Sequence, residues 1–482
     1  MKILKTTFVF TLLLTFGIAS AQTFSAFTTR VESAPESLRT TIVDSFLAAQ
    51  PRLPFFDNDT TVVWLYNGLV SSVNIPGDAN NWTLNAYSMS RLSTTNLWYH
   101  THRFESDARL DYKFVTNGSN WILDPRNPYQ VSGGFGPNSE MRMPTYQPPP
   151  EIGYSATIPH GTFFDTTFFS TELGNSRTVR VYLPPTYNTS SDSFPVVLAH
   201  DGLEYISLAR MNNVLDNLIA SERIQPCIVV FVPPVNRTNE YAGNQMSSFS
   251  AFLVNTVMAT VDQRFRTRRD PTYRATLGAS NGGNISLWLG LHYPQVFGNV
   301  VAQSSNVQTA ISNGFRDTPR LPLKLYLDLG TYDIPALIPL VRNFVPILQE
   351  RGYPYYYIEF HEGHSWGNWR AHLDIALEYL FPGPALSAPP ATTIPTRYDV
   401  AQVFPNPGNA SFTVKFHLPS PQSVSIVIFD TTARLVGSVA VGNLSTGDHI
   451  IPFDGASFAS GSYYCWVRSR SGDSVTRFVV LK

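Results

Sequence analysis

Cysteine and charge are both scarce in this sequence of 482 residues, which holds only Cys227 and Cys465 and has 14% charged residues. Two cysteines in separate apolar runs cannot form a disulfide framework, so we expect buried free thiols rather than a bridge. The formal net charge of −1 gives no basic surface, which argues against nucleic acid or an anionic membrane as a partner. Beyond the first residues no apolar run is long enough for a transmembrane anchor.

The first residues have the pattern of a secretory signal peptide. Lys2 and Lys5 precede an apolar run over residues 8–18, and small residues follow it up to Ala21. The run is short for a membrane anchor, which is the alternative, and the small residues match a cleavage site. We therefore expect residues 1–21 to be removed and the protein to be exported.

Proline is abundant, at 36 residues, and the apolar pattern divides the rest of the chain into three blocks. Residues 22–150 predict a helix plus an immunoglobulin-like β-sandwich, because a helical pattern precedes short alternating strands. Residues 154–384 alternate apolar strands with helices, which predicts a mostly parallel sheet flanked by helices. A Pro- and Ala-rich linker over residues 385–398 leads to short strands over residues 399–482, which predict a small β-sandwich. The fold class is therefore multidomain, and the central block should carry the chemistry, since parallel sheets bind ligands beyond the carboxyl ends of their strands.

A Gly-Ala-Ser-Asn-Gly sequence at residues 278–282 lies between an apolar strand pattern and a helical pattern. Alone, Gly-x-Ser-x-Gly is weak evidence, and a serine in a small-residue loop is the alternative. A strand before and a helix after are the setting of a nucleophile turn, in which small neighbours let Ser280 take a strained backbone and project its hydroxyl. This setting favours Ser280 as a nucleophile.

A serine nucleophile needs a base and usually a carboxylate that orients the base, and α/β-hydrolases carry them in the order serine, acid, histidine. Asp333 follows a predicted strand, and His364 lies in the loop after the last strand pattern. Asp328 and His361 rank lower as acid and base, because they lie within or at the end of these strands. We therefore expect a triad of Ser280, His364 and Asp333.

An oxyanion hole needs two amide N–H groups, one from the residue after the nucleophile and one from the loop after an earlier strand. Asn281 is the expected first donor and Leu203 the second, with Gly202 allowing close approach of the backbone.

His361 and His364 are three residues apart after a strand, unlike the His-Glu-x-x-His helix of zinc sites. We therefore expect no metal and no cofactor.

With these residues in place, the central block resembles the esterase D / enterochelin esterase-like family of α/β-hydrolases over roughly residues 155–383. The likeness rests on "VRVYLPPTY", "AHDGLEY", "NRTNEY", "LGASNGG" and "EGHSWGNWR", and the last is the most specific, because members carry the catalytic histidine in a Gly-His-x-Trp setting. It implies the same triad, with aspartate at an acid position where many relatives have glutamate. The expected substrate contacts are Gly202, Arg237, Glu240 and Trp366, although Arg237 and Glu240 could equally form an ion pair that positions a loop.

The two flanking blocks also resemble known modules. Residues 60–128 are similar to early-set, immunoglobulin-like modules found before such esterases and in glycogen-acting enzymes, some of which bind glucans. Trp82 is then either a sugar platform or a structural tryptophan that helps to shape the esterase cleft. The tail, with its "PNP" opening and "SGSYY", resembles the type A sorting domain of the type IX secretion system, although Ala433 stands where a glycine is usual. That likeness implies a Gram-negative bacterium, export through the outer membrane and removal of the tail.

Taken together, these patterns predict a secreted or cell-surface serine carboxylesterase with the type IX secretion machinery as a partner. The expected substrate is an ester on carbohydrate, either small-molecule or polysaccharide, with acetyl or feruloyl groups as the acyl part. The alternatives are an enterochelin-type siderophore esterase and a catalytically inactive glycan-binding surface protein. Fold likeness does not choose between these esters.

Overall fold

The computed structural model describes residues 23–384, except 51 and 135, and residues 402–482, except 419–421, 432–434 and 470–473. The predicted signal peptide (1–21) and linker (385–398) lie outside the described residues. The chain divides into two compact units, with the division between Ser387 and Ala388. In the part that the structure describes, no helix is both long and apolar enough to cross a bilayer.

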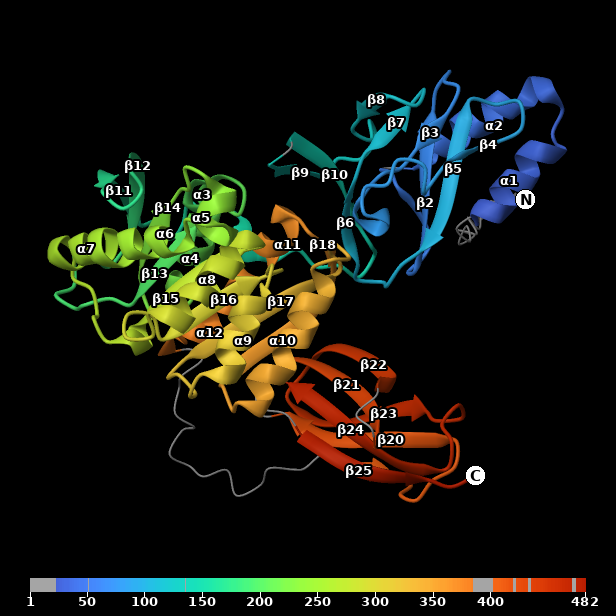
Figure 1. Ribbon diagram of the computed structural model, residues 1–482. Helices are drawn as coiled ribbons and strands as arrows, with labels where there is room; N and C mark the ends of the chain where they lie inside the picture. Colours follow the sequence, from blue (N-terminus) through green and yellow to red (C-terminus); the bar gives the residue numbers. More distant parts are fainter. Residues whose placement is uncertain are drawn as a thin grey trace, which may run out of the picture. The chain divides into compact units, whose positions relative to one another are not determined.

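The N-terminal part of the first unit packs two helices and two small sheets around one another (Figure 1). Successive residues of β2 point to opposite faces, and both faces are buried. Val63 and Leu65 pack with helix residues such as Phe27, whereas Val62 and Trp64 pack between the sheets. The elements are α1 (Phe24–Ser33), α2 (Glu36–Ala49), a sheet of β1 (Phe55–Asn58), β2 (Thr61–Asn67), β5 (Leu97–Arg103) and β4 (Ser90–Arg91), and a sheet of β3 (Val73–Asn74), β7 (Phe114–Thr116) and β8 (Asn120–Ile122).

An eleven-stranded mixed sheet forms the centre of the first unit, and its strands β13 to β18 run parallel. Its last three strands come from the N-terminal block, which the sequence did not predict. β6 joins β18 through the pair Glu362 and Arg109. The order is β11 (Thr162–Ser170), β12 (Asn175–Leu183), β14 (Ile228–Val232), β13 (Val196–His200), β15 (Arg274–Ala279), β16 (Asn299–Gln303), β17 (Lys324–Tyr332), β18 (Tyr355–Gly363), β6 (Arg109–Tyr112), β10 (Gly136–Arg142) and β9 (Gln130–Gly133).

Helices cover both faces of this sheet, because its strands are apolar on both sides. Val197 and Ala199 of β13 pack with α4, α11 and α12, whereas Val196 and Leu198 pack with α6 and α8. Asp165–Arg180 is an exposed pair on the β11–β12 hairpin at the sheet edge. The helices are α3 (Gly202–Ser207), α4 (Met211–Ala220), α5 (Arg237–Ala242), α6 (Met246–Phe252), α7 (Ala259–Arg264), α8 (Asn281–His292), α9 (Thr309–Asp317), α10 (Ile338–Glu350), α11 (Trp366–Ala371) and α12 (Leu373–Leu380).

The second unit contains two small sheets around one apolar core, as the alternating pattern of the tail predicts. Cys465 lies in that core and Cys227 in the core of the first unit, and both are free thiols, which confirms the prediction. The strands are β19 (Gln402–Phe404), β20 (Ser411–Leu418) and β23 (Gly447–Asp454) in one sheet, and β22 (Leu435–Leu444), β21 (Gln422–Asp430), β24 (Gly461–Ser469) and β25 (Ser474–Val480) in the other.

Candidate active site

Ser280 lies at the sharp turn between β15 and α8, with φ of 58° and ψ of −121°. A non-glycine residue rarely adopts a positive φ, and such strain persists only where the surroundings impose it. The turn requires glycine at position 278, because a Cβ there would lie 2.4 Å from the carbonyl carbon of Gly282. The Ser280 N–H donates to the Gln303 carbonyl at 2.8 Å, which fixes the turn from the neighbouring strand β16.

Asp333 and His364 come together because they follow the adjacent parallel strands β17 and β18. The His364 Nδ1 lies 2.7 Å from Asp333 Oδ1, which also accepts the Ile334 N–H at 2.7 Å. Asp333 is only 4% exposed. A carboxylate can only accept, so neutral His364 carries its proton on Nδ1 in this contact. That tautomer leaves Nε2 free to take up a proton.

A cavity of about 730 Å³ has both Ser280 and His364 in its wall. The wall is shared between the central domain and the N-terminal block. The N-terminal block contributes Asp78, Asn81, Trp82, Asp111, Lys113, Trp121, Gly133, Gly134 and Asn138. Other central-domain residues in the wall are Asp201, Glu204, Pro234, Arg237, Tyr332, Ile334, Ser365, Trp366 and Trp369.

The expected oxyanion donors are both at the starts of helices, where backbone N–H groups have no partner within the helix. Asn281 is the first residue of α8, and Leu203 is the second residue of α3. Gly202, Leu203 and Asn281 are not among the residues of the cavity wall, and Gly202 is buried. A Cβ on Gly202 would lie 2.4 Å from the Phe231 carbonyl carbon, so glycine is needed for α3 to begin against β14.

The rival acid and base have other partners. His361 Nδ1 lies 2.7 Å from Asp107 Oδ1, and neither residue is among those of the cavity wall. Asp328 accepts hydrogen bonds from Gln303 Nε2 at 2.9 Å and from the Ser304 N–H at 3.2 Å. Burial raises the pKa of Asp328 to about 6.

The substrate contacts expected from sequence separate into two groups. Arg237 and Trp366 line the cavity, and Arg237 forms a two-bond ion pair with Asp201 at 2.7 Å. Glu240 is fully buried, and its oxygens accept bonds from Arg177 at 2.8 and 2.9 Å. The structure therefore corrects two expectations: Glu240 does not reach the cavity, and its ionic partner is not Arg237.

Sequence reasoning missed most of the cavity wall that the N-terminal block supplies. Trp82 was expected to be either a sugar platform or a shaping residue, and it lies in this wall, with its Nε1 donating to Asp78 Oδ1 at 3.1 Å. Burial and the neighbouring Asp111 raise the pKa of Asp78 to about 8. Lys113 and Trp121 carry no local motif that marks them as cavity residues. Across the described ranges, no group of three or more His, Cys, Asp or Glu side chains is placed to hold a metal ion.

Comparison with protein families matches two segments of the chain. Residues 170–380 match a family described as putative esterase, and residues 402–482 match the secretion system C-terminal sorting domain. The Bacillus subtilis protein YjcH is 26% identical over 234 residues, which cover 45% of this chain and 97% of that protein. The sorting domain indicates a secreted or cell-surface protein.

Two relatives with described activities each match less than half of the chain. An endo-1,4-β-xylanase/feruloyl esterase of Xylanibacter ruminicola is 30% identical over 222 residues, 43% of this chain and 30% of that protein. The iron(III) enterobactin esterase of Escherichia coli K12 is 26% identical over 251 residues, 45% of this chain and 60% of that protein. This chain thus spans less than two thirds of either protein.

Solved structures of enterobactin esterases share the fold over a longer stretch. The Shigella flexneri enzyme has a TM-score of 0.60 at 19% identity, and the Salmonella typhimurium enzyme has 0.59 at 17%. Each match covers 70% of this chain and 97% or 98% of the other, so the likeness extends beyond the segment matched by sequence. The esterase family match and the esterase relatives show that this chain is a carboxylic ester hydrolase.

Proposed function

We propose that this carboxylic ester hydrolase is a secreted serine esterase in which Ser280 is the nucleophile, His364 the base and Asp333 the orienting acid. The observation that carries the proposal is the 2.7 Å bond from His364 to the buried Asp333, with His364 and Ser280 in the wall of one cavity. A strained serine on a strand-to-helix turn supports the same assignment. A serine hydroxyl needs an oriented base to activate it, and His364 would be that base.

The proposed reaction proceeds through an acyl-enzyme. Ser280 Oγ attacks the ester carbonyl carbon while its proton passes to His364 Nε2, and the oxyanion is held by the Asn281 and Leu203 N–H groups. The carbon–oxygen bond to the alcohol then breaks, and His364 returns the proton to the leaving alkoxide. Water repeats the sequence on the acyl-enzyme, which releases the carboxylic acid and regenerates Ser280.

The proposed substrate is a neutral carbohydrate ester with an acetyl or feruloyl group. Trp82 and Trp121 offer flat apolar faces that can stack on a pyranose or an aromatic ring. Among the described residues of the wall, Asp78, Asp111, Asp201 and Glu204 are acidic, whereas Lys113 and Arg237 are basic and Arg237 is paired with Asp201. A wall without excess positive charge suits a neutral ester better than a strongly anionic ferric catecholate.

A siderophore ester is the second candidate substrate. It is favoured by one observation, the likeness to enterobactin esterase structures over 70% of this chain. Turnover should therefore be compared on acetylated xylan, methyl ferulate and a ferric catecholate trilactone. Hydrolysis of only the catecholate would replace the carbohydrate ester with the siderophore as substrate.

Ser280→Ala is the direct test of the mechanism. Loss of the nucleophile should lower turnover of p-nitrophenyl acetate by about 10⁴-fold or more, with the melting temperature nearly unchanged. A fluorophosphonate probe should form an adduct on Ser280 in the parent chain and none in the variant. Activity retained by Ser280→Ala would exclude Ser280 as the nucleophile.

The flanking blocks complete the proposal. Residues 22–150 are proposed to be an early-set module that shapes the esterase cavity, and residues 399–482 to direct export through the type IX secretion machinery. Removal of the tail after export should leave a secreted form whose intact mass lacks these residues. A secreted form that retains the tail would argue against its removal.

A further inference from the structure

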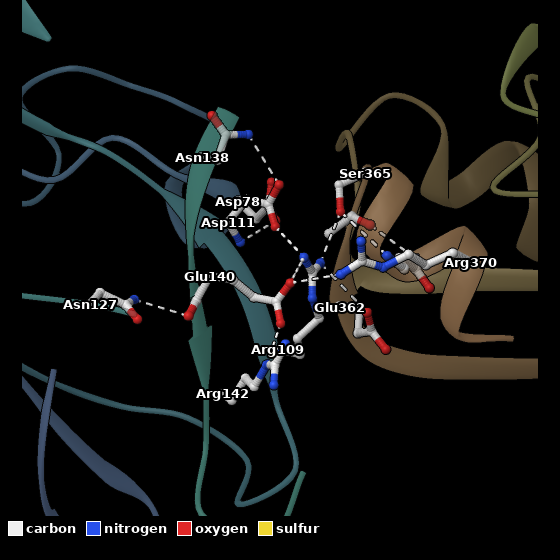
Figure 2. Close-up of polar contacts among 12 residues, drawn as sticks. Asp78, Arg109, Asp111, Asn127, Asn138, Glu140, Arg142, Glu362, Ser365 and Arg370 are labelled. Atoms are coloured by element: carbon white, nitrogen blue, oxygen red, sulfur yellow. Dashed lines mark hydrogen bonds and ion pairs between the residues drawn. The ribbon is translucent and has the colours of Figure 1, made fainter. Parts of the chain in front are cut away.

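Arg109 is the central residue of a buried polar cluster where the N-terminal block meets the central domain (Figure 2). It lies in β6 and is 1% exposed. Its Nη2 donates to Asp111 Oδ1 at 2.7 Å and to Glu140 Oε2 at 2.9 Å. A buried guanidinium needs such compensation, and its planar fork fixes the direction of each bond. These two carboxylates therefore hold Arg109 rigidly from the N-terminal side.

The other contacts of Arg109 fall on both sides of His364. Its Nη1 donates to Ser365 Oγ at 3.0 Å and lies 3.7 Å from Glu362 Oε2. The guanidinium also lies against the backbone of the helix that follows, because a Cβ on Gly367 would be 1.9 Å from Nη2. Residues 362, 365 and 367 thus bracket the candidate base.

A second side chain of the N-terminal block packs on the same loop. A Cβ on Gly363 would lie 2.1 Å from Cγ of Asp78, and the Asp78 carboxylate accepts the Asp111 N–H at 2.8 Å. The backbone immediately before His364 therefore rests on a carboxylate that the Arg109 strand itself holds. By contrast, His364 has just one polar contact that the structure records, the bond to Asp333.

We propose that Arg109 is a positioning residue for His364, so that catalysis in the central domain depends on this one contact from the N-terminal block. The inference rests on the proposed function, because it needs His364 to be the base. Arg109 does not line the cavity, so it acts through the loop of residues 362–367. Catalysis is sensitive to such displacement, since a shift of about 1 Å in a reacting group can cost about 10²-fold in rate.

The test compares Arg109→Met with the matched control Arg142→Met in the full chain. Arg142 also pairs with Glu140, and its recorded contacts among the described residues, with Glu140 and Tyr129, are both on the N-terminal side. For p-nitrophenyl acetate, we expect Arg109→Met to lower kcat about 10- to 100-fold with KM within about twofold, and to slow fluorophosphonate labelling of Ser280 in parallel. Arg109→Lys keeps the charge but not the fork, so its kcat should lie between those of the parent and Arg109→Met.

A purely structural role predicts a different result. Any of three results would overturn the proposal. Arg109→Met could fold and keep the parent kcat, it could change only KM, or Arg142→Met could lose as much kcat as Arg109→Met. If Arg109→Met does not fold, Ser365→Ala is measured instead, because it removes one hydrogen-bond acceptor of Arg109. This variant should have a kcat several-fold lower than the parent. An unchanged kcat would overturn the proposal. A wrong triad assignment can be told apart from a wrong role for Arg109, because only a wrong triad assignment leaves Ser280→Ala active.

Discussion

Two histidine–aspartate pairs flank the end of β18, and they have the same bond length in different surroundings. His364 Nδ1 to Asp333 Oδ1 and His361 Nδ1 to Asp107 Oδ1 are both 2.7 Å. The side chains of the first pair are 17% and 0% exposed, whereas those of the second are 36% and 58% exposed. Bond length alone therefore does not identify a catalytic pair.

The difference shows what a base requires from its carboxylate. Asp333 is sequestered from water and held by a backbone N–H as well, so it can keep one imidazole orientation. Asp107 is largely in solvent, where an ion pair is screened and contributes little. Only the buried pair also has its histidine in the cavity wall with Ser280.

The comparison is tested most strongly by removing each histidine. His364→Ala should lower kcat on p-nitrophenyl acetate by about 10³-fold or more, because nothing then removes the Ser280 proton. His361→Ala is the matched control and should keep kcat within about twofold. Steady-state kinetics on both folded variants measure these kcat values. A larger loss of kcat in His361→Ala than in His364→Ala would reverse the assignment of the base.

Replacing each carboxylate by its amide should have the next largest effect. Asp333→Asn leaves a side chain of the same size that no longer stabilises the imidazolium, so kcat should fall about 10²- to 10⁴-fold. Asp107→Asn should leave kcat unchanged, because its histidine does not face the cavity. Equal kcat values for the two variants would show that Asp333 does not orient the base.

The sequence predicted the central site because its parts obey local and topological rules. Ser280 follows a strand and precedes a helix, and Asp333 and His364 each follow a strand of a parallel sheet. Since the carboxyl ends of neighbouring parallel strands meet at one edge, the pairing of these residues follows from chain order. The same reasoning ranked Asp333 above Asp328 and His364 above His361.

The cavity wall and the Arg109 cluster could not be predicted in the same way. Arg109 and Asp111 alternate with apolar residues in β6, which reads locally as a solvated strand face. Instead β6 joins the central sheet beside β18, and both charged residues are buried. The expectation that Glu240 contacts substrate was wrong for the same reason, because Glu240 in α5 pairs with Arg177 of β12, 63 residues away in sequence. Burial of a charge depends on long-range pairing that local periodicity does not encode.

The smallest expected effect concerns the exposed pair, as a dependence of stability on pH. The bond to Asp107 raises the pKa of His361, and the same bond lowers the pKa of Asp107. The histidine contribution is present below its unfolded pKa of about 6.5 and is lost as pH rises through the raised folded value. The aspartate contribution is present above its unfolded pKa of about 3.9 and is lost as pH falls through the lowered folded value.

The pair should therefore stabilise the fold most between about pH 4 and 6.5, and by less than about 1 kcal/mol because both side chains are solvated. His361→Gln should lower the melting temperature of the chain slightly at pH 5.5 and by less at pH 8. Thermal melts of parent and variant at the two pH values, repeated in 1 M salt, measure this difference, and salt should reduce it. A larger destabilisation at pH 8 than at pH 5.5 would mean that His361 contributes through packing and not through its charge.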